Sequence, residues 1–351
     1  MEKVLMKGNE ACAEAAIRSG CKSYFGYPIT PQNEITAYMS KALPKIDGGV
    51  FVQAESEIGA IHMVYGCAGS GVRCLTSSSS PGISLKSEGI SYLAGADLPC
   101  VIVNIQRGGP GLGTIQPSQA DYFQSTKAIG HGDLKIPTLA PNSVQEMVDM
   151  TVKAFDIAEK YRTPVMILAD GLLGQMMEPV SFGNIKNNAE IYPYGANGHG
   201  GKRKKNITNS LYLEAINLEK CVNERFARYA EITEKESDAE YDKDASIVVA
   251  AYGSTSRVVK SAVDMARAEG INAGIFRPKT LWPFPEKQLK EATKNAKAVL
   301  VSEMSMGQMI DDVKMALEFK LPVEFYGRQG GFVPNPIEIF KKIKEMANIV
   351  L

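Results

Sequence analysis

The stretch from Tyr24 to Pro31 constrains the fold of this chain more than any other segment. It opens with an apolar run over residues 23–27, and prolines follow at positions 28 and 31. Proline fixes its own φ and disfavours helix in the residue before it, but it is tolerated at the first position of a helix. We therefore predict a strand that ends near Tyr27, and a helix over residues 31–41, with Thr30 between them. The alternative is a turn with a purely structural role.

Short β-rich runs alternate with helical patterns through the first half of the chain. Such alternation is typical of βα units on a parallel sheet. In open parallel sheets, ligands bind at the carboxyl ends of the strands, which is where the predicted strand delivers Thr30. The runs predicted to be strands are residues 23–27, 50–53, 73–77, 100–106 and 164–169, and the predicted helices include 56–68, 118–129 and 143–161.

The alternation stops at about residue 185 and starts again near residue 245. Between these points lie a basic, glycine-rich stretch at 191–205 and a helical pattern over about 211–236. A basic run on a loop is usually solvated, and a phosphate or CoA contact is the alternative. We therefore divide the chain into a first domain, 1–185, a linker with a long helix, 186–244, and a second domain, 245–351.

Composition excludes several classes of protein. The 351 residues suffice for two domains, and 39 basic residues balance 39 acidic ones. Balanced charge gives no reason to expect nucleic acid or an anionic membrane as a partner. No apolar run has the length of a membrane span, and the first residues lead into a strand without a signal-peptide core. We expect a cytoplasmic protein.

Cysteine and histidine are sparse. The six cysteines are scattered, and only three histidines occur. Zinc sites and iron–sulfur clusters normally show thiols at close spacing, so we expect no metal site in this chain. An enzyme so poor in histidine is expected to take its chemistry from a cofactor.

Two later motifs follow the first one in order: Ser-Glu-Ile-Gly-Ala at residues 56–60 and Gln-Arg-Gly-Gly-Pro at residues 106–110. Together the three resemble the first subunit, or first domain, of the 2-oxoacid:ferredoxin oxidoreductases, and the resemblance covers most of the chain. It implies an α/β fold: a thiamine diphosphate-binding (pyrimidine) domain with a parallel sheet, followed by a transketolase C-terminal-like α/β domain.

The resemblance implies a role for Glu57. In the family, a glutamate at this motif position bonds N1′ of the thiamine aminopyrimidine and favours the tautomer that removes the C2 proton. Glu55 is a competing candidate, and an acid that merely favours a helix N-terminus is the structural alternative. Tyr27, Pro28 and Ile29 are then implied to line the slot for the pyrimidine ring.

Arg107 follows a predicted buried strand and precedes a glycine-rich stretch at 108–113. Glycines let backbone approach a ligand closely, and their spacing here is a poor fit to a dinucleotide fingerprint. A guanidinium at the end of a strand suits a bidentate grip on a substrate carboxylate, and a surface salt bridge is the alternative. The resemblance places Thr30 beside the carboxylate and carbonyl of the substrate. The catalytic candidates are therefore Glu57, Thr30 and Arg107.

The Gly-Asp-Gly…Asn motif that usually marks a magnesium–diphosphate site does not occur in this sequence. We therefore expect a separate β-type subunit to hold the diphosphate and Mg²⁺, with the cofactor at the interface. The resemblance also implies a γ-type subunit and a small ferredoxin-like subunit with [4Fe–4S] clusters. CoA, a 2-oxoacid and ferredoxin are the implied reactants.

The implied reaction is oxidative decarboxylation of a 2-oxoacid to acyl-CoA and CO₂ with reduction of ferredoxin. The stretch over residues 107–122 most resembles the branched-chain type, which acts on 3-methyl-2-oxobutanoate, and it lacks the Ser-Thr-Gly that usually follows the proline in the 2-oxoglutarate type. The alternatives are the 2-oxoglutarate or pyruvate type, a non-catalytic assembly subunit, and a nucleotide-binding flavoprotein.

Overall fold

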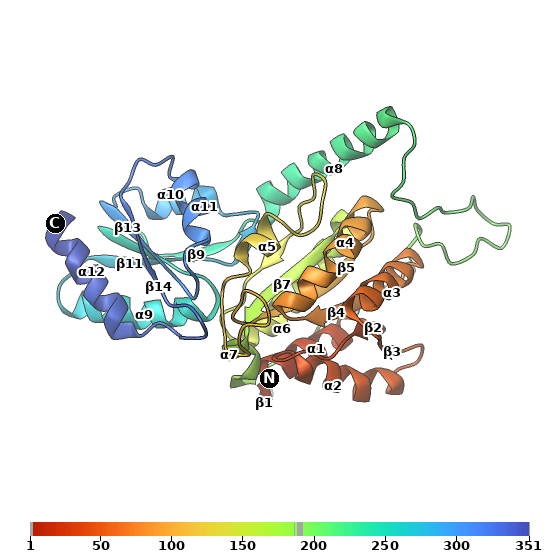
Figure 1. Ribbon diagram of the computed structural model, residues 1–351, viewed down its shortest axis with the longest axis horizontal. Coiled ribbons are helices and arrows are strands. Elements are labelled where there is room, and N and C mark those ends of the chain that lie inside the picture. Colours follow the sequence, from red (N-terminus) through yellow and green to blue (C-terminus); the bar gives the residue numbers. More distant parts are fainter. Residues whose placement is uncertain (1–2, 186, 188–191, 351) are drawn as a thin grey trace.

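The computed structural model describes residues 3–350 apart from 186 and 188–191. Figure 1 shows a body formed mainly by the first half of the chain, a second body formed by the C-terminal part, and helix α8 (Ala215–Glu236) beside the first body. Within the described residues the strands form sheets of seven, five and two strands. The predicted α/β fold is confirmed.

The seven-stranded sheet has the strand order β12-β6-β7-β5-β4-β2-β3. All its pairings are parallel except the one between β12 and β6. Its strands are β2 (Ser23–Gly26), β3 (Val50–Gln53), β4 (Cys74–Ser78), β5 (Cys100–Gln106), β6 (Thr138–Leu139), β7 (Pro164–Asp170) and β12 (Thr280–Trp282). The edge strand β12 comes from the C-terminal part of the chain, so the two bodies share this sheet.

Helices cover both faces of this sheet, and a separate apolar cluster fills each side. Helices α3 (Glu57–Gly69) and α4 (Ser80–Gly95) pack on one face, and α1 (Gly8–Arg18), α2 (Asn33–Ala42) and α6 (Val144–Tyr161) on the other. The central strand β5 is buried along its whole length, with Ile102 toward the first cluster and Val101, Val103 and Ile105 toward the second. Burial on both faces explains its continuous apolar sequence.

The five-stranded sheet has the order β14-β13-β10-β11-β9, with β9 antiparallel to β11. The apolar cluster under α3 and α4 continues into this second body, where α10 and α11 contribute to it. The remaining elements are β1 (Val4–Lys7), α5 (Tyr122–Thr126), α7 (Gly171–Gln175), β8 (Met177–Val180), β9 (Ala239–Tyr241), β10 (Ile247–Ala250), α9 (Gly253–Ala268), β11 (Ala273–Pro278), α10 (Glu286–Ala292), β13 (Ala298–Glu303), α11 (Met309–Ala316), β14 (Val323–Gly327), α12 (Pro336–Val350) and a short 3₁₀ turn over Leu43–Lys45.

Two predicted helices differ from the structure. The helix expected from residue 31 begins at Asn33, because the Pro31 carbonyl accepts hydrogen bonds from the side chains of Asn9 (2.8 Å) and Gln175 (3.2 Å). The helix expected over residues 118–129 is reduced to α5. The residues before α5 form hydrogen bonds to the second body instead of helical ones: the Gln119 N–H donates to the Met304 carbonyl at 2.9 Å.

The predicted long helix is confirmed as α8, although it begins at Ala215 rather than near residue 211. Of its residues only Tyr229 and Ile232 are buried. In the basic run before it, Arg203 donates hydrogen bonds to Asn197 Oδ1 and to the Gly195 and Gly198 carbonyls, and so holds its own loop together. The part of the chain that the structure describes holds no helix long and apolar enough to cross a membrane.

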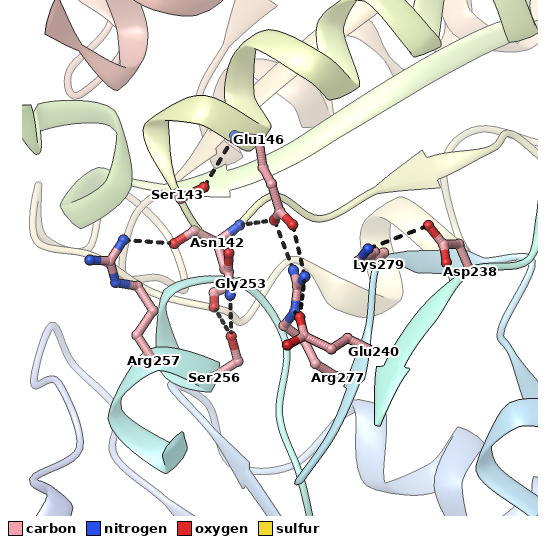
Figure 2. Close-up of polar contacts among 10 residues, drawn as sticks. All are labelled: Asn142, Ser143, Glu146, Asp238, Glu240, Gly253, Ser256, Arg257, Arg277 and Lys279. Atoms are coloured by element: carbon pink, nitrogen blue, oxygen red, sulfur yellow. Dashed lines mark hydrogen bonds and ion pairs between the residues drawn. The ribbon is translucent and has the colours of Figure 1, made fainter. Parts of the chain in front are cut away.

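A buried arginine joins the two bodies (Figure 2). Arg277 of β11 is 3% exposed, and its guanidinium donates to both carboxylate oxygens of Glu146 on α6 at 2.8 Å and to Glu240 of β9 at 2.8 Å. Burial opposes ionisation of Glu146, but the hydrogen bonds from Arg277 outweigh it, so the pKa of Glu146 lies below its ordinary value. The ion pair is thus formed at neutral pH.

We expect Arg277→Met to lower the free energy of unfolding by about 3 kcal/mol, because it leaves the largely buried Glu146 carboxylate without its partner. Urea unfolding at pH 7 measures this. A group with a lowered pKa in the folded state stabilises the protein above its unfolded pKa, and that contribution is lost as the pH falls through the folded pKa. The variant should therefore lose less stability on acidification than the parent.

Arg267→Met is the matched control. Its guanidinium pairs with Asp242 at 2.8 Å, but the arginine side chain is 46% exposed. Exposed pairs contribute less than about 1 kcal/mol. Equal losses in the two variants would contradict a special role for the buried pair.

Candidate functional site

The predicted substrate residues lie at one edge of the seven-stranded sheet. Thr30 follows β2 and Arg107 follows β5, and the carboxyl ends of these parallel strands point to the same edge. The Nη1 of Arg107 donates to the Thr30 carbonyl at 3.0 Å. Arg107 is only 8% exposed, which does not fit the alternative of a surface salt bridge. The structure therefore brings Thr30 and Arg107 together.

Three buried polar atoms lie at the carboxyl ends of the neighbouring strands β4 and β5. They are the Arg107 Nε and the hydroxyls of Ser78 and Ser79, and each has no hydrogen-bond partner among the described residues. A buried polar group without a partner costs free energy, so such groups are uncommon and call for an explanation. A polar ligand bound at this edge would satisfy them.

Glu57 and Glu55 have different surroundings. Glu57 is the first residue of α3 and is 5% exposed, whereas Glu55 precedes the helix and is exposed. The helix is capped by Ser56, whose hydroxyl accepts the Gly59 N–H at 3.1 Å. The chain therefore buries the carboxyl of Glu57 and leaves Glu55 in solvent.

Gly82, in the first turn of α4, makes room for the Glu57 carboxylate. A β-carbon on this glycine would lie 2.1 Å from Ser78 Oγ and 2.6 Å from Glu57 Oε1, which is closer than any side chain tolerates. Both oxygens thus face the N-terminal turn of α4. Two residues earlier, the hydroxyl of Ser80 accepts the Arg107 N–H at 3.1 Å. The first turn of α4 therefore contacts both Glu57 and Arg107.

The residues expected to line the pyrimidine slot are the most open part of the site. Tyr27 is 37% exposed, Pro28 is exposed, and Ile29 and Thr30 are half-buried. The Tyr27 carbonyl accepts a hydrogen bond from Gln32 Nε2 at 3.3 Å, which helps to hold this backbone. Tyr27 and Pro28 are therefore accessible to a molecule that binds at this edge.

A cleft of about 710 Å³ opens beside Thr30. Its apolar lining includes Ile115, Leu172 and Val333, of which Val333 comes from the second body. Glu34 is the charged side chain in the lining, and its pKa is lowered: burial opposes this shift, but hydrogen bonds from Asn9 and others outweigh it. The other lining residues are Pro31, Gln116, Pro117, Gly171, Gln175, Met176 and Gly331.

Lys86 belongs to this site, although the sequence analysis did not select it. It is fully buried on α4, and its Nζ donates to Thr76 Oγ1 at 2.5 Å and to the Ser77 carbonyl at 3.1 Å. Burial lowers the pKa of Lys86 to about 7, and the negative charge of Glu57 opposes that shift. A lone lysine in a helical pattern usually indicates a solvated position. The one sign of burial in the sequence is that Lys86 falls on the same side of the predicted helix as Gly82 and Gly89.

The residues present fit one half of thiamine diphosphate. A buried carboxyl, the unpartnered hydroxyls of Ser78 and Ser79 and the open segment at 27–30 suit a polar heteroaromatic ring. Within the described ranges, no group of three or more His, Cys, Asp or Glu side chains is placed to hold a metal ion.

Comparison with known proteins identifies the family. Residues 14–242 match the family described as pyruvate flavodoxin/ferredoxin oxidoreductase, thiamine diphosphate-binding, and residues 245–339 match the pyruvate:ferredoxin oxidoreductase core domain II. The ketoisovalerate oxidoreductase subunit VorB of Methanothermobacter marburgensis is 48% identical, over 99% of each chain. The 2-oxoglutarate synthase subunit KorA of Methanothermobacter thermautotrophicus is 39% identical, over 98% of this chain and 99% of its own.

Solved structures agree with this assignment. A 2-oxoglutarate:ferredoxin oxidoreductase from Magnetococcus marinus, solved with 2-oxoglutarate, coenzyme A and succinyl-CoA bound, superimposes with a TM-score of 0.87 at 28% identity. The match covers 99% of this chain and 65% of that one. A split-gene transketolase, 15% identical with a TM-score of 0.62, shares the fold. This chain belongs to the 2-oxoacid:ferredoxin oxidoreductase family and carries its thiamine diphosphate-binding domain and its core domain II.

Proposed function

We propose that this chain is the pyrimidine-binding subunit of a CoA-dependent oxidoreductase that decarboxylates 3-methyl-2-oxobutanoate and reduces ferredoxin. The observation that carries the proposal is the arrangement of Arg107 and Glu57. The buried guanidinium of Arg107 donates to the Thr30 carbonyl and has an unpartnered Nε. The first turn of α4 contacts both Arg107 and the buried carboxyl of Glu57. Under this proposal the subunit supplies two groups: a guanidinium that binds the substrate carboxylate, and a carboxyl that bonds to the cofactor ring.

Glu57 is proposed to hold a proton at N1′ of the aminopyrimidine ring, with Tyr27, Pro28 and Ile29 around that ring. When bound, thiamine diphosphate supplies the nucleophilic carbon and the electron sink for decarboxylation. Burial at the N-terminus of α3 keeps the Glu57 carboxyl out of bulk water, so its hydrogen bond to the ring is stronger than it would be in solvent.

Arg107 and Thr30 are proposed to bind the carboxylate and carbonyl of the 2-oxoacid. The free Nε of Arg107 offers a second donor beside the one used on Thr30. A guanidinium edge can donate two parallel hydrogen bonds to a carboxylate. Binding in that way would fix the orientation of the substrate relative to the cofactor ring.

The cleft beside Thr30 favours a branched alkyl side chain over a second carboxylate. Its lining is largely apolar, and its charged side chain, Glu34, is negative and pairs with Lys7 at 3.2 Å, so the lining residues offer no cation to the second carboxylate of 2-oxoglutarate. The high identity to a ketoisovalerate oxidoreductase subunit supports the same choice. The shorter side chain of pyruvate would leave part of the cleft unfilled.

The partner subunits, the location of the complex and the domain bounds of this chain are also part of the proposal. A β-type subunit would supply the diphosphate and Mg²⁺ site, while a γ-type subunit and a small ferredoxin-like subunit with [4Fe–4S] clusters complete the enzyme. We place the complex in the cytoplasm. We divide this chain into a pyrimidine-binding domain, 1–185, a linker, 186–244, and a transketolase C-terminal-like domain, 245–351.

We expect Glu57→Gln to slow exchange of the C2 proton on bound thiamine diphosphate at least about 10²-fold, the size of effect that loss of an acid–base group produces. The assembled complex is transferred to D₂O, quenched at intervals and read by proton NMR. Glu55→Gln is the control, because Glu55 is exposed, and it should exchange at the parental rate. Parental exchange in Glu57→Gln would favour a non-catalytic assembly subunit.

We expect Arg107→Lys to lower kcat/KM for the 2-oxoacid, with a loss of about 1–3 kcal/mol of transition-state stabilisation. Lysine keeps the charge but cannot form the bidentate hydrogen bonds of a guanidinium. Steady-state dye reduction with the 2-oxoacid varied at saturating CoA measures this. The KM for CoA should remain at its parental value, and a matching rise would place Arg107 at a different substrate.

The same assay ranks substrates in the parent complex, where 3-methyl-2-oxobutanoate should exceed 2-oxoglutarate and pyruvate in kcat/KM. Glu34→Gln provides the matched test of the cleft, because it removes the negative charge that pairs with Lys7 and nearly keeps the shape of the side chain. It should raise the relative activity with 2-oxoglutarate. An unchanged ranking would show that the cleft beside Thr30 does not select the side chain.

We expect the chain purified alone to contain no stoichiometric iron and to show no 2-oxoacid-dependent dye reduction. Four-thiolate clusters use closely spaced cysteines, and the six here are scattered. Iron analysis and activity assays on the single chain, and on mixtures with each partner subunit, measure this. Turnover by the chain alone would contradict a divided cofactor site.

A further inference from the structure

Gln32 bonds to the segment that is proposed to line the cofactor ring. It is the N-cap residue of α2 and is fully buried. Its side-chain Nε2 donates to the Tyr27 carbonyl at 3.3 Å, and its backbone N–H donates to the Ile29 carbonyl at 3.1 Å. Gln32 therefore holds the backbone of residues 27–29 at two points.

The amide oxygen of Gln32 bonds to strand β4. It accepts hydrogen bonds from Ser77 Oγ at 2.5 Å and from Thr36 Oγ1 at 3.3 Å. Ser77 comes directly before Ser78 and Ser79, whose buried hydroxyls have no partner among the described residues. Gln32 thus links the segment that follows β2 to the strand end that carries those two hydroxyls.

Tyr24 supports one orientation of the Gln32 amide. Its hydroxyl lies 2.7 Å from Ser77 Oγ, and burial raises the pKa of Tyr24 to about 12, so the hydroxyl keeps its proton at neutral pH. Tyr24 can therefore donate to Ser77, while Ser77 donates to the Gln32 oxygen. Because the Tyr27 carbonyl can only accept, the amide must turn its NH₂ group toward Tyr27 and its oxygen toward Ser77.

The sequence of β2 makes room for the Tyr24 hydroxyl. A β-carbon on Gly26 would lie 2.4 Å from Tyr24 Oη, which is closer than any side chain tolerates. The Tyr24 ring also stacks on Phe51 of β3, with ring centroids 5.6 Å apart and planes at 3°. Glycine at position 26 therefore lets the Tyr24 ring lie along its strand and bring its hydroxyl to Ser77.

We propose that Gln32 is a positioning residue, which holds residues 27–29 in the backbone conformation that accepts the cofactor ring. This inference rests on the proposed function of that segment. Tyr27 and Pro28 are accessible, whereas Gln32 and its partner Ser77 are fully buried, so the open segment is fixed by a buried set of hydrogen bonds. A backbone that is ordered before binding avoids the entropic cost of ordering it when the ligand binds.

The first test is amide hydrogen exchange on the full chain without cofactor, followed by mass spectrometry of proteolytic peptides. Gln32→Met keeps the length of the side chain but removes its donor and its acceptor. Peptides that cover residues 27–33 should exchange at least about 3-fold faster than in the parent, which is the effect of one lost hydrogen bond on a local opening equilibrium. Parental exchange in these peptides would overturn the positioning role.

The second test is calorimetric titration of thiamine diphosphate into the assembled complex, prepared without the cofactor and supplied with Mg²⁺. Gln32→Met should raise the Kd at least about 3-fold, while the number of binding sites per complex stays at its parental value. A purely structural defect would instead lower the number of sites and leave the Kd of the remaining sites unchanged. That result would overturn the inference.

Gln145→Met is the matched control. The amide of Gln145 on α6 also donates to a backbone carbonyl, that of Ser181 at 2.9 Å, but it belongs to no part of the proposed site. This variant should bind thiamine diphosphate with the parental Kd, and an equal rise in both variants would contradict a specific role of Gln32. If Gln32→Met does not fold, Gln32→Glu serves in its place: its carboxylate keeps the shape and an acceptor toward Ser77 but cannot donate to Tyr27.

The two proposals fail in different ways. If the parent complex binds no thiamine diphosphate, the proposed function fails, and the role of Gln32 fails with it. If the parent binds the cofactor and Glu57→Gln slows C2 proton exchange, but Gln32→Met binds with the parental Kd, the inference about Gln32 is wrong and the proposed function stands.

Discussion

The hydrogen bonds around the Asp121 carboxylate hold the candidate site together. Asp121 Oδ2 accepts from Ser80 Oγ at 2.6 Å and from Asn104 Nδ2 at 2.9 Å, and Asn104 Oδ1 accepts the Ser80 N–H at 3.2 Å. This buried network joins the first residue of α4 to strand β5. Because Ser80 also bonds the backbone of Arg107, and the same helix turn contacts Glu57, both groups are placed by one set of hydrogen bonds.

The segment that carries Asp121 also joins the second body. Gln119 Nε2 donates to the Tyr252 carbonyl at 2.8 Å, and its Oε1 accepts from Thr255 Oγ1 and from the Met304 N–H. These contacts replace the helical bonds that the sequence predicted for residues 118–129. The second body thus acts as a support for the loop between β5 and α5, in addition to supplying Val333 to the cleft.

Sequence reasoning succeeded where local pattern and burial coincide. Strands β3 and β5 have the predicted bounds, and in β5 both faces are covered, so that every residue is buried. It failed where a distant contact decides the outcome. Strand β12 joins the first sheet from residue 280 onward, and Lys86 is buried on a helix whose glycines at 82 and 89 lie close to side chains of α3. The motif residues could be chosen, but their mutual geometry depends on such contacts.

The contrast in exposure within the site has a physical consequence. Glu57 and Arg107 are buried and fixed by this chain, whereas Tyr27 and Pro28 face outward. Under the proposed function, the charged groups are preorganised before assembly, and the ring slot closes only when a partner subunit covers it. Closure by a partner would also exclude water, which strengthens the electrostatic contacts that Glu57 and Arg107 make with bound molecules. Assembly and catalytic competence would then be coupled through one surface of this chain.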